Sequence, residues 1–233
     1  MIDLKAQLRA TLKRINDAEQ RFGRSPDSVK LLAISKGHSA SRIAEVADMG
    51  LLEIGENYVQ EALHKISALS QKPIVWHFVG VVQAKKAAIL AQNFSWVHTV
   101  YRVNEAERLS HFRSPDLPPL NICIQVKLDE SATKSGILPA EVPTLYHAIK
   151  SLPHIQIRGL MTLPPQSDNF EEQRKFFKQL HELMTELNQS GAQLDTLSMG
   201  MTHDLEAAIA EGATLVRVGT GIFGERRKNH HAT

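Results

Sequence analysis

Lys36 is the first residue whose type and position suggest chemistry, because it directly follows the apolar, β-branched run Leu31–Ser35. A lysine in such a position is usually a solvated surface charge. When burial or a neighbouring positive charge weakens its hold on the proton, the neutral amine instead attacks an aldehyde and forms an imine, or Schiff base. Lys36 is therefore a candidate for covalent binding of an aldehyde, provided that the fold brings it to a site.

Two glycine-containing segments near the end of the chain carry hydroxyl side chains, as phosphate sites do. They are Ser198-Met199-Gly200-Met201-Thr202 and Gly219-Thr220-Gly221. In α/β barrels, hydroxyls and backbone N–H groups that follow the last two strands commonly bind a phosphate. Taken alone, Gly200 is equally compatible with a simple turn, and Ser198 or Thr202 with a helix N-cap. A phosphate site beside an imine-forming Lys36 predicts pyridoxal 5′-phosphate as the ligand.

Arg217 lies in the apolar run Leu215–Val218, and a buried arginine is costly unless it is paired. Placed against a pyridine nitrogen, an arginine keeps its own proton and leaves that nitrogen neutral. The pyridine ring is then a weaker electron sink than one protonated by an acid. The alternative is an ion pair between Arg217 and an Asp or Glu across the mouth of the barrel.

Asn57, His77 and His98 also stand at or after the ends of apolar runs. The spacing of Asn57 and Gln60 is typical of a helix N-cap with its capping-box partner. The two histidines are compatible with hydrogen-bonded core residues. The eleven histidines form no H-E-x-x-H pattern, and no acidic pair has metal-ligand spacing, so the sequence supports no metal site.

Short β-branched runs alternate with helical patterns from residue 30 onward, and these runs are the elements that must position the residues above. The eight predicted strands are Leu31–Ser35, Leu52–Gly55, Ile74–Val79, Trp96–Val100, Ile122–Val126, Ile155–Leu160, Leu194–Ser198 and Leu215–Val218. Eight strands separated by helices predict one α/β domain, a single (β/α)8 TIM-type barrel, with an open doubly wound sheet as the alternative. Residues 2–22 predict an extra amphipathic N-terminal helix that packs on the barrel bottom or on a partner chain.

Composition and charge narrow the class of protein. The 233 residues are 42% hydrophobic with a net charge of +2, which suits a globular domain and gives no general attraction to nucleic acid. The single cysteine, Cys123, excludes an internal disulfide framework, and no signal peptide or membrane span is evident. We therefore expect a cytoplasmic protein with one domain over residues 1–233, and a disordered tail from about residue 226.

Several sequence blocks together resemble the pyridoxal phosphate homeostasis protein family, the YggS/PROSC group. The blocks are Leu32-Ala33-Ile34-Ser35-Lys36, Gly55-Glu56-Asn57-Tyr58-Val59-Gln60-Glu61, Trp76-His77-Phe78-Val79-Gly80, Lys134-Ser135-Gly136, Gly159-Leu160-Met161-Thr162, Leu197-Ser198-Met199-Gly200-Met201 and Val216-Arg217-Val218-Gly219-Thr220-Gly221-Ile222-Phe223-Gly224. They occur in the order of the family and extend from about residue 30 to 226.

The resemblance implies a fold-type III barrel, like the N-terminal domain of alanine racemase, that holds pyridoxal phosphate as an internal aldimine on Lys36. Arg217 matches the arginine beside the pyridine nitrogen. The other implied cofactor-binding residues are Ser198, Gly219 and Thr220 around the phosphate, Gly200 and Met201 beside it, and Asn57 and His77 near the ring.

Two classes of function are compatible with this site. The first is a carrier that acts in pyridoxal phosphate homeostasis, without turnover of an amino acid, and passes the cofactor to apo-forms of pyridoxal phosphate enzymes. The alternative is a racemase-like enzyme, which needs a second acid/base group; Tyr101 is the one candidate among the three tyrosines. A lone barrel leaves the ligand partly open to water, which favours the carrier. We expect a monomer. A phosphosugar isomerase-type barrel would use the phosphate loops but leave Lys36 unexplained.

Overall fold

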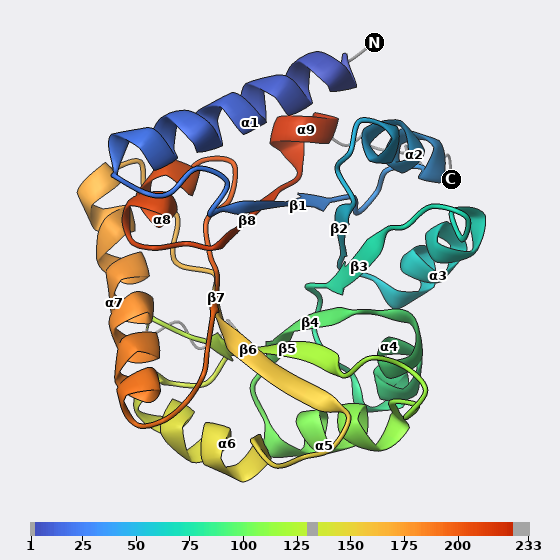
Figure 1. Cartoon of the computed structure of the whole chain (residues 1–233), viewed down its shortest axis with the longest axis vertical. Helices are drawn as coiled ribbons and strands as arrows, with labels where there is room; N and C mark the ends of the chain where they lie inside the picture. Colours follow the sequence, from blue (N-terminus) through green and yellow to red (C-terminus); the bar gives the residue numbers. More distant parts are fainter. Residues whose placement is uncertain (1–2, 130–134, 226–233) are drawn as a thin grey trace, which may run out of the picture.

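The eight predicted strands close into a parallel barrel, with each strand next to its neighbour in the sequence (Figure 1). This computed structural model describes residues 3–129 and 135–225. The strands are β1 (Lys30–Ile34), β2 (Glu53–Glu56), β3 (Val75–Phe78), β4 (Trp96–Val100), β5 (Leu120–Val126), β6 (Ile155–Thr162), β7 (Thr196–Ser198) and β8 (Leu215–Val218). Pairing of β1 with β8, where Leu32 lies opposite Arg217, completes the ring. The predicted TIM-type barrel is confirmed, and the open sheet is excluded.

Helices surround the barrel and cover its outer surface (Figure 1). They are α1 (Leu4–Arg21), α2 (Ala40–Asp48), α3 (Val59–Ala68), α4 (Ala87–Asn93), α5 (Val103–Phe112), α6 (Val142–Ile149), α7 (Phe170–Gln189), α8 (Leu205–Ala210) and α9 (Thr220–Phe223), with 3-10 turns at Ala84–Lys86 and Pro139–Glu141. Such helices bury one apolar side against the strands. The predicted tail from residue 226 lies outside the described residues.

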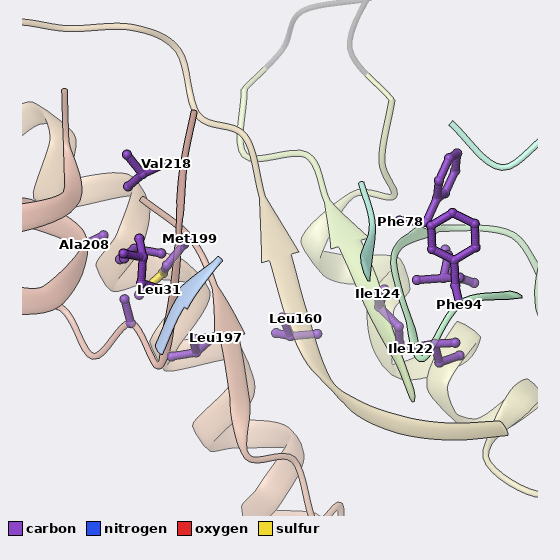
Figure 2. Close-up of a cluster of buried hydrophobic side chains, with 14 of the residues drawn as sticks. Leu31, Phe78, Phe94, Ile122, Ile124, Leu160, Leu197, Met199, Ala208 and Val218 are labelled. Atoms are coloured by element: carbon purple, nitrogen blue, oxygen red, sulfur yellow. The ribbon is translucent and has the colours of Figure 1, made fainter. Parts of the chain in front are cut away.

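The hydrophobic core lies largely between the strands and this layer of helices (Figure 2). Phe78 of β3 and Phe94, at the end of α4, pack edge to face with their ring centroids 5.5 Å apart. Leu197 and Met199 lie on another side of the barrel, in the same cluster as Ala208 of α8. This packing fixes the strand ends from which the loops of the barrel mouth project.

Helix α1 confirms the extra N-terminal helix and packs against α8 and α9 (Figure 1). The Thr11 hydroxyl donates to the carbonyl of Gly221 at 3.3 Å. The guanidinium of Arg14 donates at 2.8 Å to each carboxylate oxygen of Glu206, and at 2.9 Å to the carbonyl of Thr202. The helix therefore braces both glycine-containing segments from outside, and does not cover the barrel bottom.

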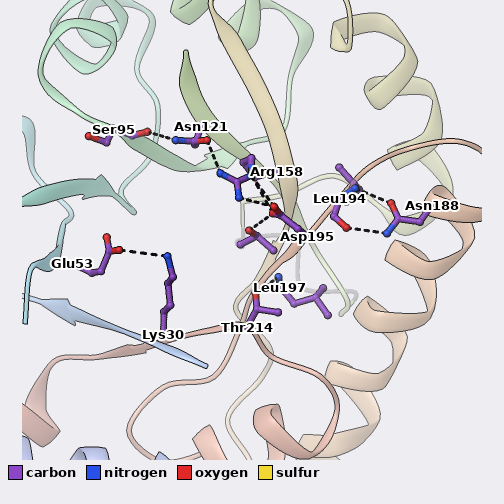
Figure 3. A network of polar contacts seen from close by, with 11 residues as sticks. Lys30, Glu53, Ser95, Asn121, Arg158, Asn188, Leu194, Asp195, Leu197 and Thr214 are labelled. Carbon is purple, nitrogen blue, oxygen red and sulfur yellow. Dashed lines mark hydrogen bonds and ion pairs between the residues drawn. The ribbon is translucent and has the colours of Figure 1, made fainter. Parts of the chain in front are cut away.

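A polar network lies at the end of the barrel where the strands begin (Figure 3). Arg158 of β6 pairs with Asp195, with a shortest distance of 2.5 Å, and donates to the Asn121 side chain at 3.0 Å. Lys30 and Glu53 are the first residues of β1 and β2, and Nζ of Lys30 lies 3.8 Å from Oε1 of Glu53. In this fold that end of the barrel generally contributes to stability, and the opposite end holds the functional site. Within the described residues, no helix is long and apolar enough to cross a membrane.

Candidate functional site

A cavity of about 460 Å³ opens at the end of the barrel where the strands finish. Six of the nine residues predicted to bind the cofactor line it: Lys36, Asn57, Met201, Arg217, Gly219 and Thr220. Residues at or just after the ends of β1, β2, β7 and β8 thus converge on one space, as the positions of the strand ends predict. His77, Ser198 and Gly200 are not part of its lining, and their proposed ligand contacts stay predictions.

The backbone on both sides of Lys36 is held by a charged cluster. Glu61 of α3 accepts the backbone N–H of Gly37 through Oε1 at 2.6 Å. The ammonium of Lys65 donates to the same Oε1 at 2.6 Å and to the carbonyl of Ser35 at 2.8 Å. Since Ser35 and Gly37 flank Lys36, α3 fixes the direction in which the Lys36 side chain leaves the strand. Lys36 itself is half-buried.

The side of the cavity formed by the last two loops presents hydroxyl groups. The Thr202 and Thr220 hydroxyl oxygens lie 3.4 Å apart, and both residues line the cavity. Gly219 sits against the end of β1, where an added Cβ would lie 3.3 Å from the Ile34 carbonyl oxygen. A small residue there lets the main chain and the hydroxyls approach an anion.

Gly200 serves the packing of α8 and does not line the cavity. Its φ of +93° favours glycine, and a Cβ would lie 2.5 Å from that of Ala208. The sequence also allowed Ser198 or Thr202 to cap this helix, and that interpretation is wrong. The N-cap residue of α8 is Asp204, whose side chain does not cap the helix but accepts the backbone N–H of Met201, which lies before the helix, at 2.5 Å.

Arg217 is held by neutral acceptors. Its guanidinium donates to the Ser198 carbonyl at 2.5 Å, the Ser198 hydroxyl at 2.8 Å and the Thr162 carbonyl at 2.7 Å. The arginine ion pairs among the described residues do not include Arg217, so the predicted alternative of an ion pair with Asp or Glu is wrong. Burial lowers the pKa of Arg217 to about 10, although the charge of Asp204 opposes this, and the side chain stays protonated at neutral pH.

Asn57 faces the cavity and does not cap α3. The N-cap of that helix is Tyr58, so the predicted capping box is wrong. The Asn57 amide oxygen is buried and has no hydrogen-bond partner within the described part of the chain. Buried acceptors are normally satisfied, so this oxygen indicates a place for a ligand donor or a water molecule.

His77 and Ser198 lie deeper in the barrel, behind Arg217. His77 is 1% exposed and donates or accepts through both ring nitrogens, to Glu53 at 2.6 Å and to His98 at 2.9 Å. Ser198 is fully buried, with its hydroxyl 2.9 Å from Nδ1 of His98. The alternative interpretation, that His77 and His98 are hydrogen-bonded core residues, is confirmed.

Acidification is expected to destabilise the fold through these two histidines. Burial lowers the pKa of His77 below its ordinary value of 6.5, although the hydrogen bond with Glu53 opposes this. Burial, together with the charges of His77 and Arg217, lowers the pKa of His98 further. The two histidine rings therefore bind a proton more tightly in the unfolded chain than in the folded one. Their contribution to stability is complete above pH 6.5 and is lost as the pH falls through the folded pKa values, with a slope of up to about 1.4 kcal/mol per pH unit for each histidine.

Urea unfolding at about pH 7 and about pH 5 measures this effect as a difference in the free energy of unfolding. A variant carrying His77→Gln and His98→Gln should lose less stability over the same interval. Equal losses in the variant and the parent chain would show that other groups carry the acid sensitivity.

Three further residues support the site although no sequence pattern indicates them: Glu61, Lys65 and Thr162. Glu61 and Lys65 are four residues apart on a helix, which is typical of a solvated surface pair. The spacing alone does not show that the helix turns this pair toward Ser35. Thr162 contributes its backbone carbonyl, for which a side-chain pattern gives no signal.

The fold and the site define a class: the family described as alanine racemase, N-terminal domain, matches residues 7–227. The pyridoxal phosphate homeostasis protein of Pseudomonas aeruginosa is 48% identical over 213 residues, 91% of each chain, and that of Escherichia coli K12 is 41% identical over 229 residues, 97% of this chain and 98% of the other. The chain belongs to the pyridoxal phosphate homeostasis protein family. A solved structure of PipY from Synechococcus elongatus, with pyridoxal phosphate bound, superposes with a TM-score of 0.80 at 36% identity, covering 90% of this chain and 100% of that one.

Proposed function

We propose that this chain binds pyridoxal 5′-phosphate in the cavity at the barrel mouth and acts in homeostasis of that cofactor. The observation that carries the proposal is the convergence of Lys36, Arg217 and the Thr202–Thr220 hydroxyl pair on one cavity of about 460 Å³. An amine, a fixed cation and hydroxyls match the aldehyde, ring nitrogen and phosphate of this cofactor. The PipY relative, whose structure contains bound pyridoxal phosphate, supports the same ligand.

The residues present fit this cofactor. The Lys36 amine would hold it covalently as a Schiff base, and the Thr202 and Thr220 hydroxyls would donate to the phosphate. Arg217, which keeps its proton, would donate to the ring nitrogen. The unsatisfied Asn57 oxygen would accept a donor of the ligand. The cofactor supplies a reactive aldehyde and, with a neutral ring, a modest electron sink.

A carrier suits this geometry better than a racemase-like enzyme. Racemisation needs two acid/base groups, one on each face of the substrate carbon. Tyr101, the predicted candidate, is not among the described residues that line the cavity. A second hollow of about 1010 Å³ also shares Asn57, Leu163 and Met201 with the cofactor cavity. This open side supports reversible loading and release.

The proposal includes a monomer that acts in the cytoplasm and supplies apo-forms of pyridoxal phosphate enzymes. The apolar side of α1, with Leu4, Leu8 and Ile15, is buried against its own chain, which supports a monomer. Burial raises the pKa of the Cys123 thiol to about 12, as suits an inert thiol in a reducing compartment.

Titration of the cofactor-free chain with pyridoxal phosphate tests the ligand. A visible absorption band should appear, and a chain that stays colourless would refute the proposal.

Incubation of the loaded chain with a panel of L-amino acids tests the carrier role. We expect no D-amino acid and no keto acid by chiral chromatography, and turnover to either product would establish the enzyme instead.

A further inference from the structure

A chain of buried hydrogen bonds runs from the cavity to the opposite end of the barrel. Arg217 donates to the Ser198 hydroxyl at 2.8 Å, and that hydroxyl lies 2.9 Å from Nδ1 of His98. Nε2 of His98 lies 2.9 Å from Nδ1 of His77, and Nε2 of His77 lies 2.6 Å from Oε2 of Glu53. Strands β8, β7, β4, β3 and β2 each contribute one of these side chains.

We call this series of hydrogen bonds, from Arg217 to Glu53, the relay. Its Glu53 end reaches water, and its interior members do not. Glu53 is the first residue of β2, where its side chain is 25% exposed and 3.8 Å from Lys30 (Figure 3). His77, His98 and Ser198 are at most 1% exposed. The ring of His77 also stacks on that of Trp96, at 5.4 Å between centroids and 6° between planes. Each of the three interior groups therefore depends on its neighbours in the relay for hydrogen bonds.

The chemistry of the two ends fixes the direction of every bond. Arg217 can only donate, and an ionised Glu53 can only accept. If both histidines are neutral, His77 must donate from Nε2 to Glu53, which leaves its Nδ1 as an acceptor. His98 must then donate from Nε2 to His77, and its own Nδ1 accepts the Ser198 hydroxyl proton. Ser198 thereby keeps a lone pair free to accept from Arg217.

The protonation states required by this direction agree with the surroundings. Burial keeps both histidines neutral by lowering the pKa of each ring. Burial alone would raise the pKa of Glu53, but the hydrogen bond and charge of His77 and the charge of Lys30 outweigh it and lower that pKa. Arginine does not release its proton, so the relay orients groups and does not conduct protons into the cavity.

We propose that Glu53, at the far end of the barrel from the cavity, orients Arg217 toward its ligand through His77, His98 and Ser198. Glu53, His77 and His98 are thus positioning residues, and this inference rests on the proposed binding of pyridoxal phosphate. Without the Glu53 acceptor, both tautomers of His77 become available, and the Ser198 hydroxyl no longer has one enforced direction. Arg217 would keep its bonds to the carbonyls of Ser198 and Thr162. The hydroxyl that accepts its third bond would no longer be held with its proton toward His98, so that bond would be weaker and less fixed in direction.

Long-range proton–nitrogen NMR correlations of the histidine rings in the cofactor-free chain test the relay directly. The parent chain should show both His77 and His98 as neutral tautomers protonated at Nε2. Glu53→Ala should alter the His98 signals, although His98 does not touch Glu53, and Glu53→Gln should restore them because its amide oxygen still accepts. A His98 ring protonated at Nδ1, or His98 signals that Glu53→Ala leaves unchanged, would overturn the relay.

Affinity for pyridoxal phosphate tests the consequence for the site. Glu53→Ala should weaken binding about 5- to 10-fold, an effect within the range of one buried hydrogen bond that is weakened, and Glu53→Gln should recover most of the affinity. Lys30→Ala is the matched control, since it removes the other partner of Glu53 but leaves the relay intact. A loss in Glu53→Ala no larger than that in Lys30→Ala would overturn the positioning role. Absence of cofactor binding in the parent chain would instead refute the proposed function, and the tautomers would still decide the relay.

Discussion

Replacing Lys36 by alanine is expected to abolish the visible absorption band that pyridoxal phosphate gives with the parent chain. The alanine methyl group has no amine to attack the aldehyde, so no covalent bond forms. Arg217, Thr202 and Thr220 remain in the cavity, and residual binding should be weak and fully reversible by dialysis. Borohydride reduction followed by peptide mass spectrometry should place the cofactor on Lys36 in the parent chain and nowhere in the variant.

Lys85→Ala is a suitable control, because Lys85 is exposed in the loop after β3, at the same end of the barrel, and does not line the cavity. This variant should keep the absorption band and the label on Lys36. Cofactor fixed by borohydride on a lysine other than Lys36, or an unchanged absorption band in Lys36→Ala, would show that the aldehyde is held elsewhere.

The fold could be predicted because parallel strands buried on both faces leave a strong signal in the sequence. All eight predicted strands exist, and the differences lie at their ends. Strand β6 continues past the predicted Leu160 to Thr162, because Met161 and Thr162 still pair with Gln125 and Val126 of β5. Pairing with a distant strand, which local sequence does not reveal, decides where a strand stops.

The ligand-facing residues in loops could also be predicted, since a loop after a barrel strand must lie at the mouth. The depth at which a strand residue lies within the barrel could not be predicted. His77 and Ser198 stand near strand ends in the sequence, yet both point into the barrel interior below Arg217. The sequence places such residues along the chain, but the tilt of the strands sets which ones meet in one layer. The relay therefore became visible only with the structure.

The charged cluster behind Lys36, formed by Glu56, Glu61 and Lys65, could likewise not be predicted from the sequence. The Lys65 ammonium lies 2.5 Å from Oε1 of Glu56 and 2.6 Å from Oε1 of Glu61. Glu56 is fully buried, and its other oxygen has no partner among the described residues. Burial raises the pKa of Glu56, although the hydrogen bonds from Lys65 and Ser35 oppose the rise. Lys65 is therefore the group that compensates this carboxylate.

Lys65→Met is expected to lower the free energy of unfolding by about 3–5 kcal/mol, the usual cost of removing one partner of a buried ion pair. Methionine keeps most of the apolar stem but leaves the Glu56 carboxylate uncompensated, so its folded pKa rises further. A raised carboxyl pKa makes folding less favourable as the pH rises above the unfolded value of about 4.5. The deficit measured by urea unfolding should therefore be larger at about pH 8 than at about pH 5.

Two further variants separate the loss of this ion pair from a general effect of removing a lysine. Lys13→Met breaks the exposed pair of Lys13 with Asp17 and should change stability little, as surface pairs do. Glu56→Gln in the Lys65→Met background should recover part of the lost stability, because it removes the uncompensated charge. If Lys65→Met were as stable as Lys13→Met at both pH values, the Glu56 carboxylate would not depend on Lys65. Because Lys65 also holds the Ser35 carbonyl beside Lys36, its loss should slow formation of the visible band even where the chain remains folded.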